Sequence, residues 1–137
     1  VLRCLSYDVR GRGGAVPQEA EPQPATHRPP GARELHHPTT EEIRLESVLH
    51  ALSDPTRLHI ARTLRDLGRP VACSVIDLAV SKSTTTHHYR VLREAGVISQ
   101  VYRGASKMNA LRSDDLEKLF PGLLDSVLSA AARQESR

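Results

Sequence analysis

The stretch SKSTTTHHYRVLREAGVI, residues 81–98, decides the fold of this chain. Ser81 and Ser83 can begin a helix, because a serine oxygen accepts a hydrogen bond from the free amides of a first helical turn. The helix is predicted over 83–95 and ends at Gly96, since glycine most readily takes the left-handed conformation that follows a helix. One stripe at helical spacing, predicted to be buried, is formed by Thr85, Tyr89 and Leu92, with His88 beside it.

The opposite face of this helix is short, polar and cationic. It carries Ser83, Thr86, His87 and Arg90. Hydroxyl and imidazole groups can read base edges, and arginine can read guanine or hold phosphate. An ordinary surface helix also shows a polar outer face, so the surroundings of the helix must decide between the two interpretations.

Basic residues gather around this helix. Residues 81–112 include six basic residues and one acidic residue, a net charge of +5, whereas the rest of the chain sums to −2 and the whole chain to +3. Charge concentrated in this way predicts a surface that attracts a polyanion. The six basic residues are Lys82, Arg90, Arg93, Arg103, Lys107 and Arg112.

The segment after the helix predicts a two-stranded β-hairpin, the wing, over 97–111. Its first strand is β-branched and aromatic, and its turn is Arg-Gly-Ala-Ser at 103–106. Apolar periodicity elsewhere predicts helices, and Pro121 should break the last of them. These helices are expected over 41–52, 55–67, 71–79, 116–120 and 122–132. The predicted fold is mainly α with a small β-hairpin, a winged helix-turn-helix in the order α-α-α-α-β-β-α.

Composition divides the 137 residues into a tail and one small domain. The first 38 residues contain ten of the seventeen Gly and Pro residues, so residues 1–38 are expected to be disordered and residues 39–137 to fold. No apolar run approaches the ~20 residues that span a bilayer, and two cysteines give no reason to expect a disulfide. With no Trp and one Phe, stacking on single-stranded bases is poorly supported. A cytoplasmic protein is expected.

Two motifs carry a family resemblance that covers about residues 41–129. ALSDPTRLHIARTL (51–64) looks like the second-helix signature of the ArsR/SmtB family of bacterial winged-helix regulators, and SKSTTTHHYRVLREAGVI (81–98) resembles its recognition helix. The resemblance implies a homodimer that binds a near-palindromic DNA operator. One recognition helix from each subunit would enter successive major grooves about 34 Å apart.

The resemblance also implies roles for individual residues. The DNA contacts carried over, on the helix and then on the wing, are Lys82, Ser83, Thr84, Thr86, His87, Arg90, Arg103 and Lys107. The first and last helices would form the dimer interface, although the apolar stripe of the last helix is equally well explained as core. The dimer residues implied are Leu45, Val48, Leu49, Leu116, Leu119, Leu123, Leu124 and Val127.

Many members of this family sense metals, but the usual ligands are missing here. The Cys-x-Cys expected just before Asp77 and Leu78 is replaced by serine, valine and isoleucine, and Cys73 lies one position too early. No histidine follows His88, so the carboxylate–histidine site of the last helix lacks its histidine too. The weak candidates for a nickel or zinc site are His36, His37 and His50.

Four classes of function can be compared on this sequence. A dimeric DNA-binding regulator controlled by an effector or partner protein leads, and a metal-responsive version of it is the first alternative. A winged-helix module that binds proteins is another, which the +5 window disfavours. An enzyme is not expected, because no Gly-x-Ser-x-Gly, phosphate-binding loop or zincin motif occurs.

Overall fold

The computed structural model describes residues 34–137, and its folded unit begins at Leu35. Most of the predicted tail lies outside the described residues. Its last residues, 35–38, belong to the folded unit, because the backbone carbonyls of His36 and Pro38 accept hydrogen bonds from arginines of the domain. The domain boundary at residue 39 was therefore predicted too late.

The first two α-helices differ in length and begin at different signals. Thr39 and Glu42 were expected to open a long first helix, but they close one 3₁₀ turn, η3 (Thr40–Glu42), in which Oε1 of Glu42 accepts from the Thr39 amide at 2.9 Å. The helix α1 then runs over Leu45–Ala51. The helix α2 (Pro55–Leu67) begins as predicted, with Asp54 as its N-cap and proline in its first turn.

The helix predicted over 71–79 is absent from the structure. Val71–Ala72 form a short strand, β1, and Cys73–Val75 form the 3₁₀ turn η4. This stretch is rich in β-branched residues, which lose rotamer freedom in a helix and suit a strand. In this stretch Val75 is 54% exposed and Ile76 is buried.

The helix α3 (Lys82–Glu94) is the element predicted from the opening stretch, and it begins one residue earlier than expected. Oγ of Ser81 accepts from the Thr84 amide at 3.2 Å and caps its N-terminus. Gly96 follows its end with φ of +88°, as predicted. A Cβ atom at Gly96 would lie 2.5 Å from Cγ1 of Ile43, so packing also requires a glycine there.

The predicted wing is part of a three-stranded antiparallel sheet. Its strands are β2 (Ile98–Arg103) and β3 (Ser106–Leu111), with Ile98 opposite Leu111 and Arg103 opposite Ser106. The strand β1 adds to the other side of β3, giving the order β1-β3-β2 and leaving β2 at the edge. The hairpin was predicted correctly, and the third strand was missed.

The chain ends in two helices, α4 (Ser113–Leu119) and α5 (Leu123–Glu135), separated at Pro121 as predicted. In the first turn of α4, Asp115 pairs with Arg112 at 2.9 Å and accepts from the Thr40 hydroxyl at 3.1 Å. Asp115 therefore ties η3 to the segment between the sheet and α4.

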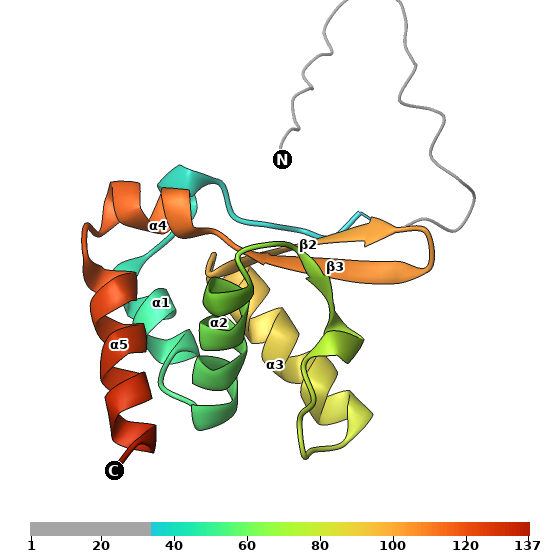
Figure 1. Cartoon of the computed structure of the whole chain (residues 1–137). Coiled ribbons are helices and arrows are strands. Elements are labelled where there is room, and N and C mark those ends of the chain that lie inside the picture. Colours follow the sequence, from blue (N-terminus) through green and yellow to red (C-terminus); the bar gives the residue numbers. More distant parts are fainter. Residues whose placement is uncertain (1–33) are drawn as a thin grey trace, which may run out of the picture. The chain divides into compact units, whose positions relative to one another are not determined.

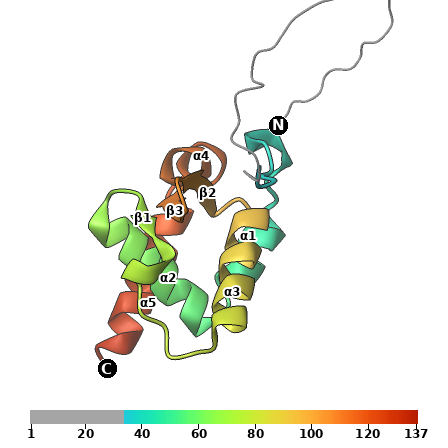
Figure 2. The same cartoon turned by 90° about the vertical axis from the view of Figure 1, so that its right-hand side faces the viewer.

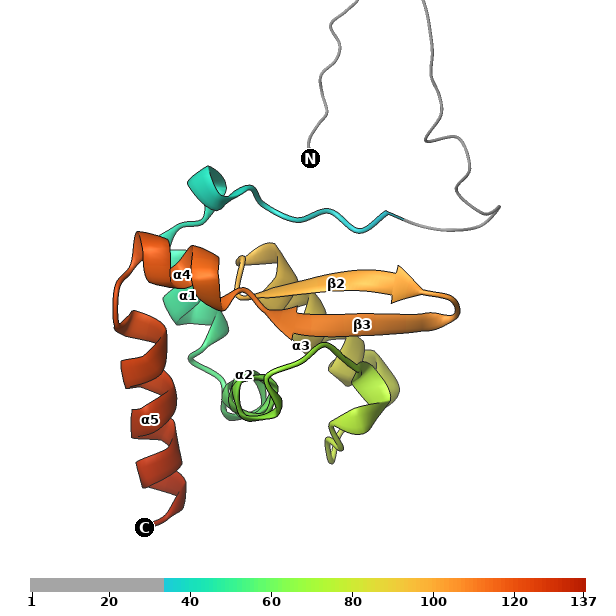
Figure 3. The same ribbon diagram turned by 45° about the horizontal axis from the view of Figure 1, so that its top comes forward.

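One core joins the helices to the sheet. In Figures 1 and 3 the β2–β3 hairpin extends away from α5, and in Figure 2 α1 lies beside α3. The arrangement is a winged helix-turn-helix. No helix within residues 34–137 is long and apolar enough to cross a membrane. The fully buried hydrophobic residues at the centre of the core are Val48, Ile60, Val71, Leu92, Val97, Ile98 and Leu128.

Candidate nucleic-acid interface

The outer face of α3 is open to solvent along its whole length. Lys82, Ser83, Thr84, Thr86, His87 and Arg90 are all exposed. Ser81 also accepts from the Thr84 amide, and Thr86 donates its hydroxyl to the Lys82 carbonyl at 3.0 Å. The hydroxyls are thus held close to the helix, while His87 and Arg90 are the larger side chains on this face.

The inner face of α3 anchors the helix, as its stripe predicted. Tyr89 and Leu92 are 2% and 0% exposed, and burial raises the pKa of Tyr89, so its phenol stays neutral. His88 is also buried, and its Nδ1 lies 3.2 Å from Nη1 of Arg57. Arg57 in turn donates from Nε to the Ala51 carbonyl at 2.7 Å. His88 is therefore packed and hydrogen-bonded, as predicted, and links α3 to α2 and the end of α1.

The wing carries two further cations. Arg103, at the end of β2, is exposed, and Lys107 on β3 is half-buried. Nζ of Lys107 lies 5.8 Å from the centre of the Tyr102 ring, so a cation–π contact accompanies it. The positive ends of these side chains and the polar face of α3 form the candidate interface with nucleic acid.

Two of the six basic residues counted in the sequence are used inside the protein. Arg93 is 9% exposed and donates to Gln100 and to the His36 carbonyl. Arg112 is half-buried, pairs with Asp115 and donates to the Pro38 carbonyl at 2.9 Å. The exposed positive charge of the interface is therefore smaller than the window of +5 indicates. It rests on Lys82, Arg90 and Arg103, with the half-buried Lys107 beside them.

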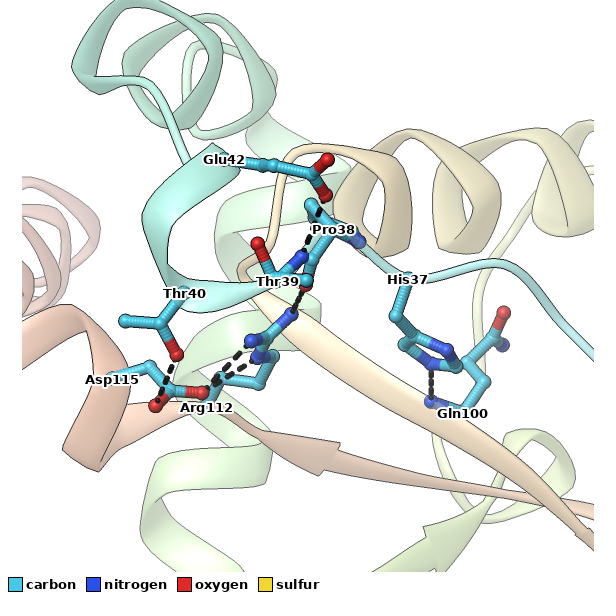
Figure 4. Close-up of polar contacts among 8 residues, drawn as sticks. All are labelled: His37, Pro38, Thr39, Thr40, Glu42, Gln100, Arg112 and Asp115. Atoms are coloured by element: carbon cyan, nitrogen blue, oxygen red, sulfur yellow. Dashed lines mark hydrogen bonds and ion pairs between the residues drawn. The ribbon is translucent and has the colours of Figure 1, made fainter. Parts of the chain in front are cut away.

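Residues 35–38 form a strap that is bonded to the sheet region: Figure 4 shows His37 at Gln100 and Pro38 at Arg112. Nε2 of His37 accepts from the backbone N–H of Gln100 at 2.9 Å, so the ring proton is on Nδ1, which donates to the Leu35 carbonyl at 2.9 Å. Burial lowers the pKa of His37, and the nearby Arg93 and Arg112 cations lower it further. The hydrogen bond to Leu35 raises this pKa, but the net shift is downward. The ring is held neutral and takes the Gln100 amide at the outer edge of β2.

Comparison with known proteins agrees with this geometry. No protein-family model matches the chain. The chain is 33% identical over 89 residues to the "Uncharacterized HTH-type transcriptional regulator YceK" of Bacillus subtilis, covering 64% of this chain and 88% of that protein. It is also 29% identical over 74 residues to an "Uncharacterized HTH-type transcriptional regulator" of Methanocaldococcus jannaschii, covering 53% of this chain and 83% of that protein.

The chain belongs to the HTH-type transcriptional regulators. DNA binding by a helix-turn-helix is the activity that this family and the geometry share. In helix-turn-helix proteins a recognition helix contacts base edges in the major groove, and α3 of this HTH-type regulator is the candidate for that helix. These relatives establish the broad class of HTH-type regulators. Membership of the narrower ArsR/SmtB family stays a prediction.

The residues predicted for the dimer interface of the regulator fall into three groups by burial. Val48, Leu116 and Leu124 are buried in the core of one chain and are not available to a second copy. Leu45 and Leu49 on α1 are 43% and 45% exposed. The half-buried remainder, Leu119, Leu123 and Val127, pack against the core from α4 and α5.

The candidate metal ligands of the regulator are not brought together. Among residues 34–137, no group of three or more His, Cys, Asp or Glu side chains lies close enough to hold an ion. Both ring nitrogens of His37 already have partners. His50 lines a surface depression of about 380 Å³ between α1 and α3, together with Glu46 and Glu94. Metal binding stays a prediction, without a site among residues 34–137.

The sequence did not identify the polar residues that support the interface from inside. Arg93, Gln100 and Asn109 are buried, but in the sequence they resemble surface positions of a helix and a hairpin. One signal was present: Gln100 and Asn109 stand at positions that alternation places on the buried face of β2 and β3. A polar side chain on such a face needs a hydrogen-bonding partner.

Proposed function

We propose that this protein is a homodimeric regulator of the ArsR/SmtB type that binds a near-palindromic DNA operator. The observation that carries the proposal is the exposed face of α3, with Thr86, His87 and Arg90, next to a wing that bears Arg103 and Lys107. The helix would read base edges in the major groove, and the wing would hold flanking phosphate or the minor groove. The proposal assigns no catalytic step and places the protein in the cytoplasm, on the nucleoid when bound.

The exposed leucines of α1 support the dimer. Leu45 and Leu49 lie one helical turn apart on α1 and are 43% and 45% exposed, so together they offer a second copy an apolar strip. Leu49→Lys should give a monomer in sedimentation experiments, because a charge would be buried at the interface. Val75→Lys, which changes a still more exposed valine outside α1, is the control. Equal masses for wild type and Leu49→Lys would contradict this interface.

The usual metal sites of the ArsR/SmtB family are not part of the proposal. Both cysteines of the usual Cys-x-Cys are replaced, and Cys73 lies one position too early to stand in for either of them. A metal-responsive regulator using His36, His37 and His50 from two subunits is the alternative. Control by another effector or by a partner protein fits the proposal equally.

The test is binding of metal-free protein to the DNA upstream of its own gene, at two salt concentrations and with nickel or zinc added. A non-specific duplex of equal length is the control. Tight binding that weakens with salt supports the proposal, since each phosphate contact releases counterions. Absence of any salt-dependent binding would favour a protein-interaction module instead. A large change on adding metal would favour the metal-responsive alternative.

A further inference from the structure

A chain of buried polar side chains joins the recognition helix to the wing. Nη1 of Arg93, on α3, donates to Oε1 of Gln100, on β2, at 2.6 Å. Nε2 of Gln100 donates to Oδ1 of Asn109, on β3, at 2.6 Å. We call Arg93, Gln100 and Asn109 the polar relay; their exposed fractions are 9%, 1% and 0%.

Both ends of the polar relay continue into neighbouring elements. Nδ2 of Asn109 donates to the Val71 carbonyl at 3.2 Å and to Sγ of Cys73 at 3.1 Å, so the relay reaches β1 and η4. Nε of Arg93 donates to the His36 carbonyl at 3.2 Å, so the relay also reaches the strap. The polar relay thus connects α3, all three strands, η4 and the strap by hydrogen bonds.

Buried hydrogen bonds are directional, so they restrict the relative orientation of the two elements that they join. Apolar side chains pack acceptably at several relative angles, and a core built only from them loses uniqueness before it loses stability. A buried donor left without its acceptor loses its full hydration, so a rotated hairpin would leave Arg93 and Asn109 unsatisfied. The relay therefore favours one orientation of β2–β3 against α3.

We propose that Arg93, Gln100 and Asn109 are positioning residues that fix the wing relative to the recognition helix, so that both engage one DNA duplex at once. The inference rests on the proposed DNA binding through α3 and the wing. Fixing the orientation in the free protein avoids an ordering cost on binding. Arg93 acts in this way through Gln100, since its own guanidinium is buried away from the interface.

The first test measures orientation without DNA. Residual dipolar couplings of backbone amides report the direction of the β2–β3 hairpin relative to α3. Wild type and the control Arg69→Lys, an exposed arginine outside the interface, should fit one orientation. Arg93→Lys and Gln100→Met should reduce the hairpin couplings or fit a different orientation, while those within α2 and α5 stay the same. Couplings of both variants that fit the wild-type orientation would overturn the proposal.

The second test is a double-mutant cycle in DNA binding. Arg93→Lys keeps the charge of the chain, so loss of attraction to DNA is not its effect. If the wing is misplaced in Arg93→Lys, Arg103→Ala should raise the dissociation constant for DNA by a smaller factor in that background than in wild type. The two factors should differ about fivefold or more. Removing Arg90, on α3 itself, should cost the same in both backgrounds.

The two tests separate the possible failures. If wild type binds no DNA, the proposed function fails, and the dipolar couplings still decide whether the relay fixes the hairpin. If DNA binds and the Arg103 loss is equal in both backgrounds, the positioning role is wrong and the relay only stabilises the fold. If Arg93→Lys folds poorly, the same double-mutant cycle can be measured with Gln100→Met, in which methionine has a size similar to glutamine.

Discussion

The backbone N–H of Gln100 donates to Nε2 of His37 across 63 positions of sequence, at 2.9 Å. Only an unprotonated nitrogen can accept this bond, so the contact exists only while the His37 ring is neutral. Gln100 lies on the edge strand β2, and its side chain belongs to the polar relay. Protonation of His37 would therefore loosen the strap at the point where it meets the wing.

Stability should depend on pH through His37. Its pKa is lowered in the folded protein by burial, and by the Arg93 and Arg112 cations, from a value of 6.5. The unfolded chain thus binds this proton more readily than the folded one. The stabilisation is complete above about pH 6.5 and is lost as pH falls through the folded-state pKa. Thermal melting of wild type between about pH 7 and pH 5 should show the loss.

The matched variant for His37 is His37→Gln, which keeps a side-chain acceptor for the Gln100 amide but does not titrate. Its melting temperature should fall less than that of wild type over the same range. His50→Gln, at an exposed histidine on α1, should follow the wild-type curve. Parallel curves for wild type and His37→Gln would show that His37 contributes nothing to the pH dependence.

Gly96→Ala should destabilise the protein strongly. Its φ of +88° disfavours any Cβ, and the new atom would meet Cγ1 of Ile43 at 2.5 Å. Left-handed strain and overpacking together predict a loss of about 2–4 kcal/mol in unfolding free energy by chemical denaturation. Gly68→Ala is the control, with a similar φ of +65° but nothing within 4 Å of a Cβ. Equal losses in the two variants would mean that the Ile43 contact costs nothing.

The elements predicted correctly are those whose signals are local. The helix α3 has a serine cap, a periodic apolar stripe and a terminal glycine within residues 81–96, and α2 has Asp54 and Pro55 at its start. The break at Pro121 follows from the missing proline amide. Each of these features depends on residues that are neighbours in the chain, so the sequence alone was enough to find them.

What the sequence did not reveal depends on distant pairing. The strand β1 forms because Val71 lies opposite Asn109, and no local pattern indicates that partner. The strap was assigned to the tail because its contacts, from His37 to Gln100 and from Pro38 to Arg112, span 63 and 74 positions. For the same reason Arg93 and Arg112 were counted as surface charge, although their acceptors lie inside the domain.

Arg90→Ala should weaken operator binding by about 1–3 kcal/mol if Arg90 contacts a base edge. The residue is exposed in the second half of α3, on the face opposite the buried Tyr89 and Leu92. The loss should be largest for the cognate operator and small for non-specific duplex, measured by fluorescence anisotropy. Arg69→Ala removes the same charge from an exposed site outside the interface and is the control. Equal affinities of wild type and Arg90→Ala would exclude this role.

Arg103→Ala separates two roles of the wing. The residue is exposed at the end of β2 and pairs in register with Ser106 across the hairpin turn. If it holds phosphate, all sequences should bind more weakly by a similar factor, and the slope of log affinity against log salt should fall by about 0.9. Titrations at three salt concentrations, on operators with intact and altered flanks, measure both quantities. A loss confined to operators with intact flanks, with an unchanged slope, would mean that the wing reads sequence instead.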